Sequence, residues 1–286
     1  MRSLLNDALL WYGVRTPYFP GKASTVDWIA SHSHQTAFGK VTVERRGVHW
    51  ELDLRCPIQR SLYYLGWWEV WDTKFLQSLL WPGACVIDVG ANCGYYALLA
   101  GKTVGPSGLV YAFEPAGEAF KQLVKNIELN DMTWVYAEKQ ALGDSETVGF
   151  ISISPPENRL SQGVCLQPGA GTEEIKVTTL DIFARKTNIS RLDFLKVDIE
   201  GYEPRFLRGA SDTIRRFMPL MMIELYPLGL EQHGCQTPDF IAQIESLGYE
   251  VFILKRRTLR KWQLAKSPAW CNLIAIPMKR RKRFGV

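Results

Sequence analysis

Two acidic residues stand at the ends of short apolar runs, separated by a glycine-containing turn. Asp88 lies in the run Cys85–Val89, which leads into Gly90-Ala91-Asn92-Cys93-Gly94. Glu114 follows the next apolar run and comes twenty residues after Gly94. Gly90 permits a sharp turn, and Gly94 lets a ligand approach the backbone where a helix begins. A carboxylate at the Glu114 position can accept both hydroxyls of a ribose, so this pattern predicts a nucleotide-containing cofactor.

The turn favours a cofactor without a pyrophosphate. Asn92 stands where the dinucleotide fingerprint Gly-x-Gly-x-x-Gly has its middle glycine, and Tyr95 and Tyr96 crowd the start of the helix. Asp88 can hold an ammonium group, directly or through water. These features favour S-adenosylmethionine. The alternative is a nicotinamide cofactor in an oxidoreductase, which the missing glycine opposes.

A second acidic group occurs in Lys196-Val-Asp198-Ile-Glu200-Gly-Tyr-Glu203 and at Glu224. Because ligands of open α/β sheets bind at the carboxyl ends of the strands, Asp198, Glu200 and Glu224 are expected to meet in one cleft. Methyl transfer to a hydroxyl needs that oxygen positioned and relieved of its proton. We expect Asp198 close to the methyl group, with Glu200 and Glu224 orienting the acceptor or taking its proton. His233 is the other candidate base.

Other interpretations of these acids stay open. Glu203 can simply begin a helix, where the helix dipole favours a carboxylate. Three acids could also chelate Mg²⁺ and bind adjacent substrate hydroxyls. We rank a metal-free site above this, because Asp198 and Glu200 are expected to point to opposite faces.

The elements that must position these residues alternate between strands and helices. Strands are expected at 85–89, 109–113, 133–137, 194–197 and 220–225, and helices around 96–100, 116–129 and 204–217. This alternation is typical of a parallel sheet covered by helices. The final strands, 249–254 and 271–276, have no crossover helix between them and must pair antiparallel. The expected fold class is therefore α/β, a Rossmann-like sheet that is mostly parallel with an antiparallel C-terminal hairpin.

The chain before this sheet is different in character. Residues 41–45 and 48–54 alternate in polarity around Arg46-Gly47, which predicts a small N-terminal β-hairpin. Residues 1–40 are rich in turn formers, with a short amphipathic helix expected within 1–13, and residues 154–172 look like a flexible lid. We expect an extension at 1–40, a hairpin and helical lead-in at 41–75, a cofactor-binding domain at 76–278 and a basic tail at 279–286.

Several short motifs in order resemble the FkbM-type S-adenosylmethionine-dependent methyltransferases, which are usually O-methyltransferases. The motifs are Gly66-Trp-Trp-Glu69, Pro82-Gly83, Val86–Asn92 with Gly94, Phe113-Glu-Pro115, Ala141-Leu-Gly-Asp144, Leu195–Glu203, Gly209-Ala210, Ile223-Glu224 and Asn272–Pro277. Cys93 departs from the family's usual aliphatic residue. The resemblance implies a class I methyltransferase fold with S-adenosyl-L-methionine over the strand ends. The expected cofactor-binding residues are Asp88, Gly90, Ala91, Asn92, Gly94, Glu114, Pro115, Ala141 and Asp198.

Charge and composition limit the partners. The 34 basic and 29 acidic residues give a net charge of +5, but residues 255–286 contain eleven basic and no acidic residues. The remaining chain therefore sums to 5 − 11 = −6, which argues against a nucleic-acid coat. The basic tail is expected to be solvated, with weak contact to an anionic surface as the alternative.

Absent segments and motifs limit both the expected location of the protein and its acceptor. No apolar run has membrane-spanning length, and the N-terminus reads poorly as a signal peptide, so we expect a cytoplasmic protein without a transmembrane segment. The six cysteines form no Cys-x-x-Cys pair. The Asn/Asp-Pro-Pro-aromatic motif of methyltransferases that act on nucleobase amino groups is absent, and Asp198-Ile-Glu-Gly stands at its position. No Pro-Cys dipeptide is present to supply the nucleophile for methylation of cytosine C5. A hydroxyl on a sugar, glycan precursor or polyketide-like metabolite is the expected acceptor; a non-catalytic binding protein is the other alternative.

Overall fold

The computed structural model describes residues 4–32, 39–152, 164–165, 169, 171–266, 268 and 270–284. Contacts divide these residues into two compact units, one up to Thr73 and one from Lys74 onward. Most of the segment expected to form a lid, 154–172, lies outside the described residues.

The first unit joins helices to the expected hairpin. Its elements are α1 (Leu4–Arg15), α2 (Lys22–His32), β1 (Lys40–Arg45), β2 (Val48–Asp53) and α3 (Pro57–Leu65). β1 and β2 pair antiparallel, so the predicted hairpin is confirmed. The segment 1–40 contains two helices, α1 and α2, rather than mainly loop. Lys22, at the start of α2, is one reason, because its buried side chain ties α2 to the end of α1. Its Nζ donates hydrogen bonds to the carbonyls of Gly13 (2.8 Å) and Thr16 (2.7 Å).

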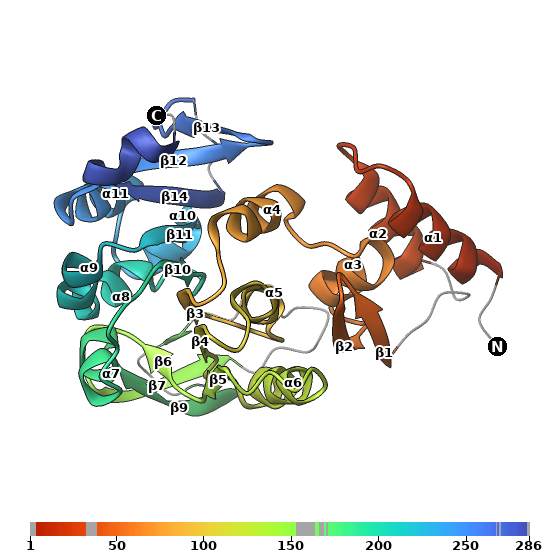
Figure 1. Cartoon of the computed structure of the whole chain (residues 1–286), viewed down its shortest axis with the longest axis horizontal. Helices are drawn as coiled ribbons and strands as arrows, with labels where there is room; N and C mark the ends of the chain where they lie inside the picture. Colours follow the sequence, from red (N-terminus) through yellow and green to blue (C-terminus); the bar gives the residue numbers. More distant parts are fainter. Residues whose placement is uncertain are drawn as a thin grey trace. The chain divides into compact units, whose positions relative to one another are not determined.

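The second unit is built on an eight-stranded sheet (Figure 1). Its order is β13-β12-β14-β11-β10-β3-β4-β5. The strands are β3 (Cys85–Val89), β4 (Leu109–Phe113), β5 (Val135–Glu138), β10 (Phe194–Val197), β11 (Leu220–Leu225), β12 (Tyr249–Lys255), β13 (Thr258–Lys261) and β14 (Cys271–Pro277). Strands β5, β4, β3, β10 and β11 are parallel, whereas β14 pairs antiparallel with both β11 and β12. The predicted Rossmann-like fold, with an antiparallel C-terminal end, is confirmed.

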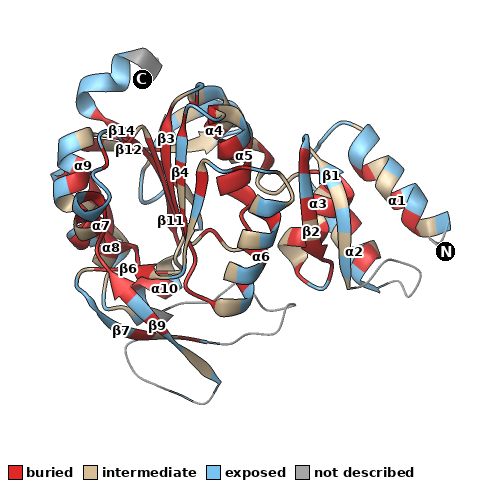
Figure 2. Cartoon of the chain, turned by 60° about the horizontal axis from the view of Figure 1, so that its bottom comes forward, coloured by how far each residue is buried: buried red, intermediate tan, exposed pale blue. Residues whose placement is uncertain are grey.

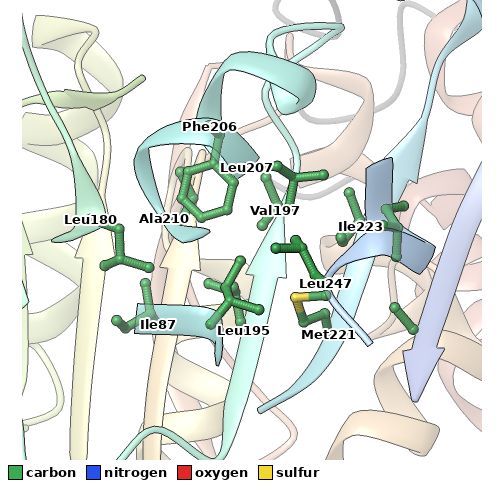
Figure 3. Close-up of a cluster of buried hydrophobic side chains, with 14 of the residues drawn as sticks. Ile87, Leu180, Leu195, Val197, Phe206, Leu207, Ala210, Met221, Ile223 and Leu247 are labelled. Atoms are coloured by element: carbon green, nitrogen blue, oxygen red, sulfur yellow. The ribbon is translucent and has the colours of Figure 1, made fainter. Parts of the chain in front are cut away.

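The helices of this unit are α4 (Val70–Leu79, which begins before the boundary), α5 (Tyr95–Val104), α6 (Gly117–Glu128), α7 (Leu180–Lys186), α8 (Glu203–Gly209), α9 (Ser211–Phe217), α10 (Pro227–Gln232) and α11 (Thr237–Ser246). The central strands are buried along their length (Figure 2). Their side chains meet those of α7, α8 and α11 in one apolar core, in which Leu195, Phe206 and Met221 are fully buried (Figure 3). This packing removes a large apolar area from water and so fixes the strand ends that carry the acids.

The single helix expected at 204–217 is in fact two helices, α8 and α9, which break at Ala210. The break has a tertiary cause. The Asp181 carboxylate, from α7, accepts hydrogen bonds from the backbone N–H groups of Asp212 (3.2 Å) and Thr213 (2.7 Å). A remote side chain therefore supplies the N-terminal cap of α9.

A second sheet of four strands was not expected. It has the order β6-β9-β7-β8 and consists of β6 (Ala141–Leu142), β7 (Thr147–Ser152), β8 (Val164–Cys165) and β9 (Thr172–Thr178). β7 and β9 pair antiparallel and flank the segment in which a lid was expected.

The basic end of the chain continues β14 into a 3-10 helix, η2 (Met278–Phe284). Glu250 of β12 accepts hydrogen bonds from Lys261 of β13 (2.6 Å) and from Arg281 of η2 (3.5 Å). Two basic segments that are apart in the sequence thus meet at one acid. Among the described residues, no helix is long and apolar enough to cross a bilayer.

Candidate functional site

Glu114 is fixed at the carboxyl end of β4 by the backbone of two turns. Its Oε2 accepts a hydrogen bond from the N–H of Asn92 (2.8 Å), and its Oε1 accepts one from the N–H of Ala116 (2.8 Å). The side chain is buried, with 6% of its surface exposed. The carboxylate thus joins the turn after β3 to the start of α6, and its acceptor oxygens lie where a carboxylate can bind ribose hydroxyls.

Asp88, in β3, is almost completely buried, and its Oδ2 has no hydrogen-bond partner among the residues that the structure describes. Burial raises the pKa of this carboxyl to about 7; Lys196 opposes the rise, whereas Asp198 and Glu114 add to it. An orphaned acid at a strand end is suited to a cationic ligand group, because a cation would restore the missing partner.

The turn after β3 depends on glycine for protein packing. Gly90 has φ +83°, and a Cβ there would overlap the carbonyl oxygen of Asp198. Gly94 has φ +93°, and a Cβ there would lie 2.5 Å from Leu98 Cδ1 and 2.8 Å from Leu123 Cδ1. We expected Gly94 to make room for a ligand; the structure shows that this side of it is filled by α5 and α6. Asn92, φ +50°, is also left-handed.

The remaining expected cofactor residues lie around this turn. Ala91 is buried, and its N–H donates to the carbonyl of Phe113 (2.9 Å). Pro115 is buried beside Glu114, and Ala141 lies in a small apolar cluster with Ala116 and Tyr202. These apolar surfaces can line a cofactor pocket, but they offer no side-chain hydrogen bond of their own.

The second group of acids forms one cluster. Asp198, Glu200 and Glu224 each offer a carboxylate oxygen, and these oxygens all lie within 4.8 Å of one another. The structure thus brings together the three acids that we expected to meet. Asp198 follows β10, and Glu224 lies in the neighbouring parallel strand β11, which explains the proximity of these two.

A sharp turn brings Glu200 into the cluster. Glu200 has φ +57° and Gly201 has φ +101°, so the chain reverses directly after β10. A Cβ on Gly201 would overlap the backbone of Gly229 in α10, so the turn and that helix touch backbone to backbone. Glu203, fully buried at the start of α8, closes the turn by accepting a hydrogen bond from the N–H of Ile199 (2.9 Å). Glu203 therefore begins α8, as the helix-start interpretation expected, and its hydrogen bond also holds the turn.

Three polar partners of the cluster escaped the sequence analysis. The Nζ of Lys196, 1% exposed, donates to Asp198 Oδ2 (2.9 Å) and to Asn272 Oδ1 (3.0 Å). The Nε1 of Trp270 donates to Glu224 Oε1 (2.8 Å). A lysine inside an apolar strand was a usable signal, because a buried ammonium group needs acceptors; nothing local in the sequence signals Trp270 or Asn272.

Burial and mutual repulsion raise the pKa values of the acids in this cluster. Burial, followed by the charge of Asp198, raises the pKa of Glu200 to about 8. Burial, followed by the charges of Asp198 and Glu200, raises the pKa of Glu224 to about 11. Such perturbed groups concentrate at functional sites.

His233 is outside this cluster. It ends α10, and its ring packs edge-on against Tyr202 with 5.2 Å between ring centroids. Burial, followed by the charge of Arg205, lowers its pKa. Its described contacts are therefore to Tyr202 and Arg205 rather than to the three acids.

The two parts of the site share one piece of backbone. β3 and β10 are neighbouring parallel strands, and the N–H of Asp198 donates to the carbonyl of Val89 (3.0 Å). The site thus offers an anchored carboxylate for ribose, an orphaned acid for an ammonium group, and more carboxylates nearby. These residues fit S-adenosylmethionine, which carries a ribose, an ammonium group and a cationic sulfur.

Comparison with known proteins agrees with this geometry. The profile of the methyltransferase FkbM domain matches residues 88–251, more than half of the chain. Methyltransferase 1 of Beauveria bassiana is 26% identical over 159 residues, which cover 49% of this chain and 64% of that protein. The hexuronic acid methyltransferase AglP of Haloferax volcanii is 27% identical over 128 residues, covering 45% of this chain and 50% of that protein. The chain thus matches less than two thirds of the length of each.

Among solved structures, a methyltransferase FkbM from Methylobacillus flagellatus KT is similar with a TM-score of 0.45 and 14% identity. The match covers 75% of this chain and 51% of that one.

Proposed function

The chain belongs to the methyltransferase FkbM family; we propose that it is an S-adenosylmethionine-dependent methyltransferase and that it methylates a hydroxyl oxygen of a sugar or a similar small metabolite. The observation that carries this proposal is the cluster of Asp198, Glu200 and Glu224, beside the cofactor residues. Carboxylates are the side chains best suited to bind hydroxyl groups and to take a proton from one of them.

S-adenosylmethionine, when bound, supplies the methyl group from its sulfonium. Glu114, placed by its two backbone hydrogen bonds, holds the ribose by accepting hydrogen bonds from its hydroxyls. Asp88 holds the ammonium group through its orphaned Oδ2. The turn from Gly90 to Gly94 fixes the distance between these two acids, because Asn92 is hydrogen-bonded to Glu114 itself.

Asp198 lies between the two halves of the site and is assigned the proton transfer. Its Oδ2 is held by Lys196, which orients the carboxylate and leaves Oδ1 to accept the proton of the acceptor hydroxyl. The acceptor oxygen gains the methyl group and gives its proton to this carboxylate. Glu200 and Glu224 hold the acceptor by hydrogen bonds to its other hydroxyl groups.

A sugar is favoured as the acceptor because three carboxylates around one small space match several hydroxyl groups at once. AglP of Haloferax volcanii, a hexuronic acid methyltransferase, gives a concrete class for testing. Neutral hexosides and hexuronides should both be offered, since three acids with Lys196 as their partner carry a net negative charge when ionised, which repels a uronate and favours the neutral sugar.

The test incubates purified protein with S-adenosylmethionine and these two classes of glycoside, and follows the formation of S-adenosylhomocysteine and of the methylated sugar by mass spectrometry. With an accepted sugar, Asp198→Asn should lower kcat by about 10²-fold or more, the range of general-base catalysis, while S-adenosylhomocysteine binding is kept. Glu231→Gln, an exposed acid of α10, is the matched control and should keep full activity. Unchanged kcat in Asp198→Asn would remove Asp198 from the reaction, and methylation confined to nitrogen acceptors would overturn the proposal.

A further inference from the structure

The carboxylate of Glu224 is only half satisfied within the acid cluster. Its Oε1 accepts a hydrogen bond from Trp270, but its Oε2 has no hydrogen-bond partner among the residues that the structure describes. The side chain is 7% exposed, so bulk water cannot readily replace that partner. An orphaned oxygen in such a place destabilises the protein unless a ligand satisfies it.

The cluster also lacks positive charge. Asp198, Glu200 and Glu224 lie together, and within the described part of the chain Lys196 is the one cation that forms an ion pair with any of them. Its Nζ is 2.9 Å from Asp198 Oδ2 and also serves Asn272. If all three acids are ionised, two negative charges remain after this pairing. A partly buried site with that balance attracts a divalent cation.

Contacts from the surrounding structure hold Glu200 in its place within the cluster. Glu200 is held in a left-handed conformation, with φ +57°, which is strained for a residue other than glycine. This conformation is maintained by the contact of Gly201 with Gly229 and by the hydrogen bond from Ile199 to Glu203. Strain of this kind persists only where the surrounding structure enforces it, and it concentrates at ligand sites.

We propose that Asp198, Glu200 and Glu224 together bind one hard divalent cation, of the class of Mg²⁺, Mn²⁺ or Ca²⁺. Only carboxylate oxygens converge here, which is the donor set that such ions prefer. Opposite oxygens lie about 4.2 Å apart around Mg²⁺ and about 4.8 Å apart around Ca²⁺, twice the metal–oxygen distance. The oxygens of the three acids lie within 4.8 Å of one another, so they can surround one ion of this class.

This site differs from the metal-free site that we expected from the sequence. That expectation rested on Asp198 and Glu200 pointing to opposite faces, whereas their carboxylate oxygens lie within 4.8 Å of each other. The left-handed turn at Glu200 and Gly201 is the cause.

A bound cation changes which acceptors the site can take. This consequence rests on the proposed function. The bound cation offers positive charge to two adjacent oxygens of the sugar, including those of the carboxylate of a hexuronide.

Mn²⁺ is the probe, because its electron paramagnetic resonance signal reports free and bound ion without any turnover. Metal-stripped full-length protein is titrated with Mn²⁺ in the absence of cofactor and acceptor, and then with Ca²⁺ and Mg²⁺ as competitors. The expected result is one bound Mn²⁺ per chain, displaced by Ca²⁺ or Mg²⁺. Glu200→Gln and Glu224→Gln should each weaken binding by about tenfold or more, whereas the control Glu231→Gln should leave it unchanged.

Thermal melting of each variant shows whether it is folded, and Glu200→Gln decides the matter if the buried Glu224→Gln variant does not fold. The proposal is overturned if the wild-type protein leaves Mn²⁺ free, or if folded Glu200→Gln binds as tightly as the wild type. Methylation of a sugar by protein that binds no cation would refute this inference alone. Cation binding without methylation of any hydroxyl would refute the proposed acceptor alone.

Discussion

A methyl group added at Gly90 tests whether the cofactor turn and the acid cluster share one piece of backbone. Gly90 has φ +83°, and a Cβ there would overlap the carbonyl oxygen of Asp198 and lie 2.9 Å from its carbonyl carbon. Left-handed alanine costs about 1–2 kcal/mol, and forcing an extra carbon into a packed contact adds about 1–3 kcal/mol. Gly90→Ala should therefore lose roughly 2–5 kcal/mol of folding stability.

Gly83→Ala is the matched control for this substitution. Gly83 has a similar φ, +89°, in the same unit, but a Cβ there meets nothing closer than Ser107 at 3.7 Å. The control carries the backbone strain without the collision. At about 2–4 °C per kcal/mol for a domain of this size, Gly83→Ala should lower the Tm by roughly 2–8 °C and Gly90→Ala by roughly 4–20 °C.

Calorimetric melting measures both variants, and isothermal titration with S-adenosylhomocysteine and with Mn²⁺ measures the two halves of the site. Gly90→Ala should weaken both ligands, because the displaced carbonyl belongs to Asp198, whereas Gly83→Ala should weaken neither. Equal Tm values for the two variants, or intact binding of both ligands to Gly90→Ala, would refute the view that this contact joins the two halves.

Two further changes address the cofactor side directly. Glu114→Gln replaces an acceptor oxygen with an NH₂ group facing a backbone N–H, so affinity for S-adenosylhomocysteine should fall by roughly 5–150-fold, the equivalent of about 1–3 kcal/mol; titration calorimetry checks this, and an unchanged affinity would show that Glu114 does not hold the ribose. Burial raises the pKa of Asp88 to about 7, so below that pH the carboxyl is protonated and cannot attract an ammonium group. Affinity should therefore rise about fivefold from pH 6 to pH 7, as ionisation grows. Asp88→Asn should flatten that slope, and a slope that persists in this variant would assign it to another group.

Much of the large sheet could be predicted from the sequence because its strands are short apolar runs closed by glycine or acid. The expected bounds of β3, β4, β10 and β11 match those of the structure. The break between α8 and α9 could not be predicted, since the cap at Thr213 comes from Asp181 in another helix. Such a cap is a tertiary contact that leaves no local pattern.

The small sheet was missed for a related reason. β6 has only two residues, and β7 pairs with β9 across an intervening stretch of sequence rather than through a tight turn. No tight turn joins β7 directly to β9, so the local sequence pattern of a hairpin is absent. β13 was also missed, because it is surrounded by basic residues and such a polar sequence is typical of a loop.

In the candidate site, the sequence predicted which acids follow the strands but not how all of their side chains lie relative to one another. Strand ends placed Asp198 and Glu224 at one edge, and that is enough to predict that they are neighbours. It is not enough to place Glu200, because the chain could leave β10 in several directions. The direction is set by Gly201 against Gly229, two glycines that are far apart in the sequence.

The same contacts explain why cofactor and acceptor residues must be considered together. Asp198 donates its N–H to Val89 (3.0 Å) and touches Gly90 through its carbonyl, so its backbone is held on both sides by the turn that bears the cofactor. Glu224, in contrast, belongs to β11 and is oriented by Trp270. The acid cluster thus has one member tied to the cofactor turn and one tied to the C-terminal end of the chain. A cation bridging Asp198 and Glu224 would connect these two parts, so its binding should report on the integrity of both.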